Sequence, residues 1–213
     1  MTKYAARDLV LTITAPVQTG LTSVASTDIF TLTAHGYVAG DAVTFTALTG
    51  GAGLVIGKRY YVIATNLAAN TFMVSATAGG ATFDHTTNVT AGSVAKFNPV
   101  GQVSALGKAG SQRNLIEASA YGDAWTDWVV GQQDGNEMDF EVELDNTSTG
   151  HVAVKTAYDA GVPTRFGLTM TAANFDVAFP ALLTKWERGG DLDGLLLGAG
   201  TIKILNPGVT DTP

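Results

Sequence analysis

The segment NEMDFEVELD, Asn136–Asp145, alternates acidic and apolar residues along its whole length. Its carboxylates share one parity and are Glu137, Asp139, Glu141, Glu143 and Asp145. The other parity is apolar and consists of Met138, Phe140, Val142 and Leu144. Because successive side chains of a strand point to opposite faces, this pattern predicts a strand with an apolar core face and an acidic outer face.

The acidic face carries a repulsion that an ordinary exposed strand relieves with lysines. Side chains two residues apart on a strand lie about 6.6–7 Å apart, which is within the screening length of about 8 Å. Yet the 41 residues between Arg113 and Lys155 contain nine acidic residues and no Lys or Arg. Two interpretations remain open here: a solvated outer face, or a surface that needs negative potential. The pattern favours neither a calcium site nor a catalytic acid pair, because a straight row of carboxylates does not wrap around one ion.

Composition places the chain among globular proteins. Of its 213 residues, 46% are hydrophobic and 15% are charged, which is enough apolar side chain for a core and excludes a disordered chain. We expect no membrane span, since no apolar run approaches about 18–20 residues, and no signal peptide, since the N-terminus lacks an apolar h-region. The absence of cysteine excludes disulfides and thiolate metal sites. The net charge of −7 disfavours a grip on nucleic acid phosphates.

The rest of the chain predicts a mainly β fold with one helix, expected over Thr149–Ala160. Ser148 or Thr149 can cap its start, Gly161 suits its end, and Val152, Thr156 and Ala160 recur on one face. A short helical turn is expected over Asp123–Val130, followed by a turn over Gly131–Gly135. The other expected strands are Leu9–Ala15, Gln102–Leu106, Leu115–Tyr121, Thr164–Met170, Phe175–Phe179, Leu182–Glu187 and Gly200–Leu205.

The stretch from Thr22 to Lys96 has a different texture, poor in charge and rich in Thr, Gly and Ala. Short strands separated by turn residues are expected here, at Ile29–Thr33, Ala42–Thr46, Tyr60–Ala64, Thr71–Ser75 and Ser93–Phe97. Five strands at this spacing predict a small antiparallel barrel or sandwich of about 70 residues.

No residue pattern points to catalysis, a metal or a cofactor. His35, His85 and His151 lack the spacing of a zinc helix, and neither a nucleophile elbow nor a phosphate loop is present. Trp125 and Trp128 are more typical of core anchors than of a stacking platform. We therefore expect no enzyme activity, no metal and no cofactor.

Outside the stretch from Thr22 to Lys96, which would be an insertion, the chain resembles the major tail tube proteins of long-tailed, non-contractile (siphovirus, lambda-like) phages. The order and spacing of several segments carry this resemblance. They are PVGQVSALGKAGSQRNLIEAS (Pro99–Ser119), DAWTDWVVGQQDGNEMDFEVELDN (Asp123–Asn146), FPALLTKWE (Phe179–Glu187) and TIKILNPG (Thr201–Gly208). The inserted stretch is similar to small β modules of phage tail and fibre proteins.

The resemblance implies a tail-tube-type β-sandwich with one flanking α-helix, interrupted by an inserted small antiparallel β-barrel. Residues 1–20 would supply the first strand, 21–97 the inserted module on the outer surface, and 98–213 the remainder. It further implies a structural virion protein, made in the bacterial cytoplasm, whose homohexameric rings stack into a tube for DNA delivery. Tape-measure, tail terminator and tail-tip proteins would be its partners, and DNA would pass without specific binding.

Under this resemblance some of the five carboxylates, Glu137, Asp139, Glu141, Glu143 and Asp145, would line the lumen. The polar loop Gly107–Asn114 would contact the adjacent ring, with Gly107, Lys108, Gln112 and Arg113 as candidate residues. Two alternatives stay open. One is a carbohydrate-binding or adhesin module using Trp125, Trp128 and Tyr60–Tyr61. The other is a hydrolase using the acidic row.

Overall fold

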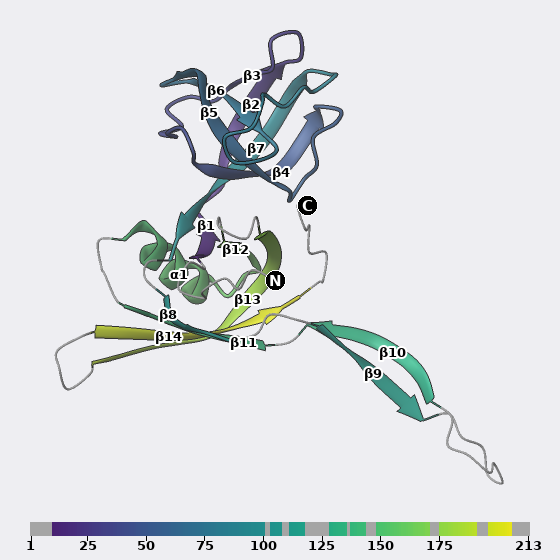
Figure 1. Cartoon of the computed structure of the whole chain (residues 1–213), viewed down its shortest axis with the longest axis vertical. Coiled ribbons are helices and arrows are strands. Elements are labelled where there is room, and N and C mark those ends of the chain that lie inside the picture. Colours follow the sequence, from purple (N-terminus) through teal and green to yellow (C-terminus); the bar gives the residue numbers. More distant parts are fainter. Residues whose placement is uncertain are drawn as a thin grey trace, which may run out of the picture.

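The computed structural model describes residues 10–100, 103–107, 111–117, 128–135, 137–143, 148–170, 175–190 and 196–205. Within these ranges the chain is mainly β with one α-helix, which confirms the predicted fold class (Figure 1). The described strands form a twelve-stranded sheet in the order β2-β3-β6-β5-β4-β7-β1-β12-β13-β14-β11-β8 and a two-stranded sheet of β9 and β10. One end of the long sheet closes on itself, and the other curves around the helix.

The closed end is an antiparallel barrel, because β2 pairs with β7 as well as with β3. Its strands are β2 (Gln18–Val24), β3 (Ile29–Thr31), β4 (Ala42–Gly50), β5 (Arg59–Ala68), β6 (Thr71–Ser75) and β7 (Val89–Pro99). The centre of its core is Phe30, whose ring stacks 5.3 Å from the rings of both Phe45 and Phe72. The predicted barrel is thus present, with six strands instead of five.

Strand β2 is the one that the sequence pattern did not predict. Its register on β7 shifts between Thr19 and Leu21, and the intervening Gly20 has φ +86°. A bulge of this kind breaks the alternation by which a strand is recognised. Only Leu21 and Ser23 of β2 are buried, so too few regular positions remain to mark it.

The other half of the sheet is built around the helix α1 (Thr149–Ala160). Its strands are β1 (Val10–Thr14), β12 (Thr164–Met170), β13 (Phe175–Gly190), β14 (Leu196–Ile204), β11 (Glu137–Glu143) and β8 (Val103–Leu106). β13 pairs with β12 through its first half and with β14 through its second half, and it bends between them (Figure 1). The sheet therefore turns back on itself, and its inner face and α1 share one apolar core.

The continuous strand β13 replaces the two separate strands predicted at 175–179 and 182–187. Pro180 lies within β13, although proline cannot donate to a strand ladder. In the structure the Pro180 carbonyl accepts a hydrogen bond from the Leu205 amide at 3.1 Å, on the edge that faces the end of β14. The missing N–H lies at that same edge, so the pairing of Pro180 with Arg165 on β12 loses no hydrogen bond.

The helix has the predicted bounds but buries a different face. Gly161 ends it at φ +60°, with its amide donating to the carbonyls of Ala157 and Tyr158. The expected face of Val152, Thr156 and Ala160 is exposed, and Gly150, His151, Ala153, Val154 and Ala157 are buried instead. The reason is close approach: a Cβ on Gly150 would lie 1.8 Å from the Pro99 carbonyl oxygen. The helix packs through a face that includes Gly150 and two alanines, while the equally apolar Val152 stays exposed.

A buried cation joins the barrel to the rest of the sheet. Arg59 of β5 is 3% exposed, and its Nη1 lies 2.6 Å from Asp176 Oδ1 of β13. Its Nη2 donates to Thr12 Oγ1 of β1 at 2.8 Å, and its guanidinium lies over the Phe97 ring at 4.2 Å. Gly167 of β12 provides the space for this guanidinium, because a Cβ there would lie 1.7 Å from Nη2. We call this cluster the junction.

The separate two-stranded sheet consists of β9 (Ser111–Glu117) and β10 (Trp128–Gly135). It contradicts three expectations: a loop up to Asn114, a helical turn reaching Val130, and a turn over 131–135. Residues 123–127 of that expected helical turn lie outside the described residues. Among the described residues this two-stranded ribbon pairs with no third strand. A ribbon without a buried face does not need alternating apolar residues, so its polar stretches were predicted as loops and turns.

Candidate functional site

The acidic row keeps its predicted alternation on β11. Met138, Phe140 and Val142 are buried, whereas Glu137 and Asp139 are exposed and Glu141 and Glu143 are half-buried. β11 lies between β14 and β8, so its outer side chains are flanked on both sides by other strands. Asp145, the fifth candidate, lies outside the described residues.

The neighbouring strands extend this surface and partly neutralise it. Glu137 lies opposite Lys203 of β14. Asp139 lies opposite Thr201, whose hydroxyl donates to Asp139 Oδ1 at 2.7 Å, and Thr201 lies opposite Lys185 of β13. The sequence around β11 contains no lysine, but in the structure two lysines from strands later in the chain lie on the same surface as its carboxylates.

The surface nevertheless stays negative. Ala199 of β14 lies between Glu141 of β11 and Glu187 of β13. Glu187 forms an ion pair with Lys185, with 2.9 Å between the carboxylate oxygen and Nζ. We define the acidic face as this outer surface of β11, β14 and β13. Its charged residues are Glu137, Asp139, Glu141, Glu143, Glu187, Lys185 and Lys203. Five carboxylates against two ammonium groups leave a formal charge of −3.

The middle of the acidic face is hollowed because its neutral residues are small. Ala105, Gly107 and Ala199 lie beside Asp139 and Glu141 around a shallow hollow of about 430 Å³. The Gly107 amide donates to the Asp139 carbonyl oxygen at 2.6 Å. Gly107 therefore belongs to this face and not to a free loop.

The structure separates the four candidate ring-contact residues. Gly107 directly follows β8 beside the acidic face, and Lys108 lies outside the described residues. Gln112 and Arg113 are on β9, opposite Asp134 and Gln133 of β10.

Of the aromatic residues suggested for carbohydrate binding, the two tyrosines are engaged in contacts within the fold. Tyr60 is buried in the barrel core, and its hydroxyl accepts a hydrogen bond from the Val55 amide at 2.9 Å. The Tyr61 hydroxyl donates to Asp176 at the junction, and burial together with this contact raises its pKa to about 12. Trp128 is on β10, and Trp125 lies outside the described residues.

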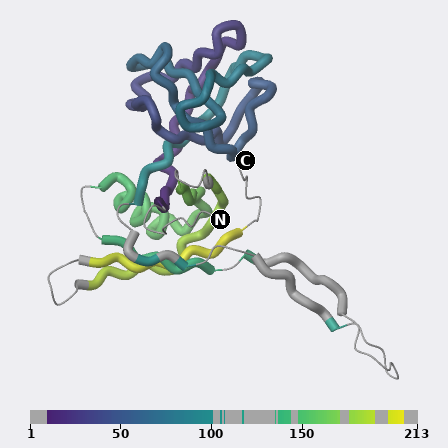
Figure 2. The backbone as a smooth tube through the Cα atoms, in the orientation of Figure 1, coloured from purple at the N-terminus to yellow at the C-terminus, as the bar shows by residue number. Residues whose placement is uncertain are grey.

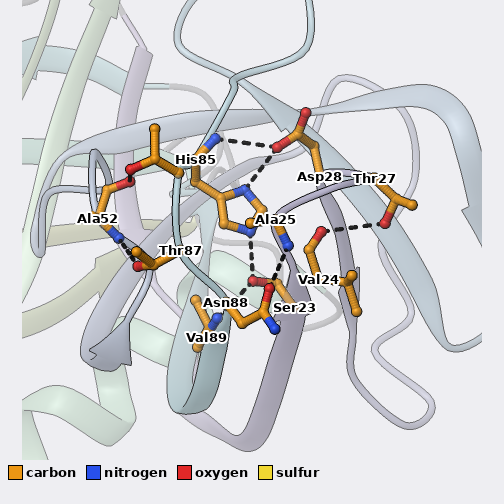
Figure 3. Close-up of polar contacts among 11 residues, drawn as sticks. Ser23, Val24, Ala25, Thr27, Asp28, Ala52, His85, Thr87, Asn88 and Val89 are labelled. Atoms are coloured by element: carbon orange, nitrogen blue, oxygen red, sulfur yellow. Dashed lines mark hydrogen bonds and ion pairs between the residues drawn. The ribbon is translucent and has the colours of Figure 1, made fainter.

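A second polar cluster in the barrel has the residue order of a catalytic triad (Figure 3). Ser23 Oγ lies 2.6 Å from His85 Nε2, and His85 Nδ1 lies 3.1 Å from Asp28 Oδ1. The sequence analysis missed this cluster, because a serine of β2, an aspartate in the next turn and a histidine 62 residues after the serine form no local motif. Only the closure of the barrel brings them together.

Burial gives this cluster a structural role. His85 is 0% exposed and Ser23 is 5% exposed, and the His85 ring stacks on Phe30 at 5.0 Å. Ser23 Oγ also accepts a hydrogen bond from the Val89 amide at 3.0 Å. A nucleophile must meet its substrate, whereas this hydroxyl is enclosed and already bonded. The cluster ties the start of β7 to β2.

The Ser23→Ala variant tests this role. It would leave the Val89 amide and His85 Nε2 without a partner, so we expect a loss of about 1–3 kcal/mol in the free energy of unfolding. Thr27→Ala is the matched control, because its hydroxyl makes one exposed bond to the Val24 carbonyl. Urea unfolding measures both variants, and equal stabilities would contradict the structural role of the cluster.

The described part of the chain holds no group of three or more His, Asp or Glu side chains placed to bind a metal ion. Its helix is too short and too polar to cross a membrane.

Comparison with known proteins gives similarity at the level of structure. No family model matches the chain, and no curated protein sequence matches it. One similar solved structure is the tail of an empty gene transfer agent particle with C6 symmetry, at 10% identity and a TM-score of 0.46, covering 55% of this chain and 87% of that one. Another is the virion of a native gene transfer agent particle, at 11% identity and a TM-score of 0.46, covering 55% and 89%.

Proposed function

We propose that this chain is a structural subunit of a virion tail tube. Six copies form a ring, rings stack into a tube, and the acidic face lines the channel through which DNA passes. The observation that carries the proposal is the acidic face itself: a row of carboxylates on a curved sheet, at a net charge of −3, opposite a well-packed core. The resemblance of the sequence to tail tube proteins supplies the assembly.

The charge of the acidic face suits passage and not capture. Duplex DNA carries one negative charge per about 1.7 Å, and each phosphate that a protein neutralises adds affinity. A basic channel would therefore hold the DNA in place. Six acidic faces would instead surround it with a formal charge of −18, which repels the phosphates from every side and leaves the polymer mobile.

Unpaired strand edges offer surfaces for contact between subunits. β8 pairs only with β11 among the described strands, and β9–β10 pairs with no third strand. An isolated two-stranded ribbon is at best marginally stable in water, so a partner surface would stabilise it. We assign β8 to contacts within the ring, and β9–β10 to contacts between rings.

The barrel belongs on the outer wall in this arrangement. It lies at one end of the molecule, and the layer of β8, β11 and β14 lies at the other (Figure 1). We therefore propose that the barrel strands β2 to β7 form an insertion that projects outward from a tube domain built by the rest of the chain, so that the insertion begins at Gln18 and not at residue 21.

Electron microscopy of the purified chain tests the assembly. At high protein concentration and in crowding salts we expect rings or tubes without any added ligand. A variant with residues 110–134 replaced by a flexible Gly–Ser linker should stay folded but form no stacked rings. A Gly–Ser replacement of the barrel loop 77–82 is the control and should assemble normally. Single subunits of the unmodified chain at every concentration would refute the proposal.

A further inference from the structure

A narrow apolar groove of about 330 Å³ lies where α1 and the start of β12 meet the base of the barrel. Small side chains form most of its lining, including Ala95 of β7 and Ala160 of α1. Val17 and Val162 also line it and are each 52% exposed. The groove lies on the far side of the core from the acidic face, so it has no part in the channel proposed above.

One charged residue, Arg165 of β12, lines this groove. Its guanidinium lies against Gly57, where a Cβ would be 2.7 Å from Nη1. Its Nε is buried and has no hydrogen-bond partner, and no described residue accepts a hydrogen bond from its guanidinium or forms an ion pair with it. Burial lowers the pKa of Arg165 below its usual range. By contrast, Arg59 at the junction has Asp176 and Thr12 as partners.

An arginine that is half-buried without an acceptor is costly. A buried charged donor loses its hydration, and the loss is recovered only when an acceptor reaches it. The described residues that line the groove around Arg165 are mostly apolar and include no carboxylate. The group that completes this site must therefore bring its own acceptor together with apolar atoms that fill the groove.

We propose that the groove binds a segment of a second copy of this chain, with an apolar side chain in the groove and a neighbouring carboxylate on Arg165. Charge complementarity favours this occupant, because the chain carries 19 acidic residues against 12 basic ones and so offers carboxylates in excess. The guanidinium matches a carboxylate through two parallel hydrogen bonds. The contact rests on the proposed assembly and adds a subunit interface to it.

Two substitutions test the interface by independent routes. Ala160→Trp fills the groove from an exposed position of α1, and Arg165→Met removes the charge but keeps a long apolar side chain. Val152→Trp is the matched control, because Val152 is an exposed residue of the same helix and does not line the groove. Circular dichroism and thermal melting establish that each variant is folded.

Sedimentation velocity over a range of protein concentrations is the measurement. We expect Ala160→Trp and Arg165→Met each to raise the concentration of half-assembly at least about tenfold, while Val152→Trp assembles like the unmodified chain. If the unmodified chain and both groove variants assemble alike, the groove proposal is overturned and the tail tube proposal stands. If the unmodified chain stays monomeric, both fall. If Ala160→Trp assembles normally and only Arg165→Met fails, the apolar pocket is no part of the interface and the proposal is overturned.

Discussion

Replacing Glu141 and Glu143 together with lysine is expected to turn the proposed channel from one that releases DNA into one that holds it. Each subunit gains four units of positive charge, so the acidic face changes from −3 to +1. In a ring of six this places twelve ammonium groups along the DNA path. Because each neutralised phosphate strengthens binding and makes it salt-dependent, we expect DNA release from assembled particles to slow at least about tenfold.

The fold should tolerate this change. Both side chains lie on the outer face of β11 opposite Ala199 and Leu197, and neither belongs to the apolar core. The control is Asp84→Lys with Asp159→Lys, which changes the net charge equally at two exposed positions outside the acidic face. DNA binding by fluorescence anisotropy at two salt concentrations and ejection from particles are the measurements. Unchanged DNA ejection in the double lysine variant would contradict the proposal that the acidic face lines the channel.

Replacing Arg59 with methionine is expected to cause the largest loss of stability in the molecule. The variant leaves the Asp176 carboxylate, which is 14% exposed, without its cation. Removing one partner of a buried ion pair costs about 3–5 kcal/mol, because the remaining charge has lost its water and its counter-charge together. We also expect the barrel to melt separately from the rest of the chain, since the junction links the two.

Lys155→Met on α1 is the matched control. Its ion pair with Asp159 is more than half exposed on both sides, and exposed pairs contribute about 0–1 kcal/mol. Differential scanning calorimetry and urea unfolding report both variants. Equal losses for Arg59→Met and Lys155→Met would show that the junction adds no more than a surface contact.

Regular local patterns carried most of what the sequence could predict. The alternation around Phe140 is the same in sequence and structure, because a strand with one buried face needs period-two side chains. The end of α1 followed from Gly161, which adopts the left-handed conformation that a helix stop requires.

Other features could not be predicted, because the residues that determine them are far apart in the sequence. The buried face of α1 depends on the space beside Pro99, which favours Gly150 over the more apolar Val152. The charge around β11 depends on Lys203, brought there only by pairing with β14. The contacts of His85 depend on barrel closure in the same way. No local window contains these pairings.

The path of β7 has a consequence for how such a chain can change over generations. β7 leaves the barrel and ends beside β1, with Thr14 opposite Phe97 and the Ala15 amide donating to the Lys96 carbonyl at 2.7 Å (Figure 2). The two ends of the barrel segment are thus hydrogen-bonded neighbours, about 5 Å apart. A short turn would bridge the same gap, so we expect that the barrel can be removed or exchanged over generations while the rest of the sheet keeps its register.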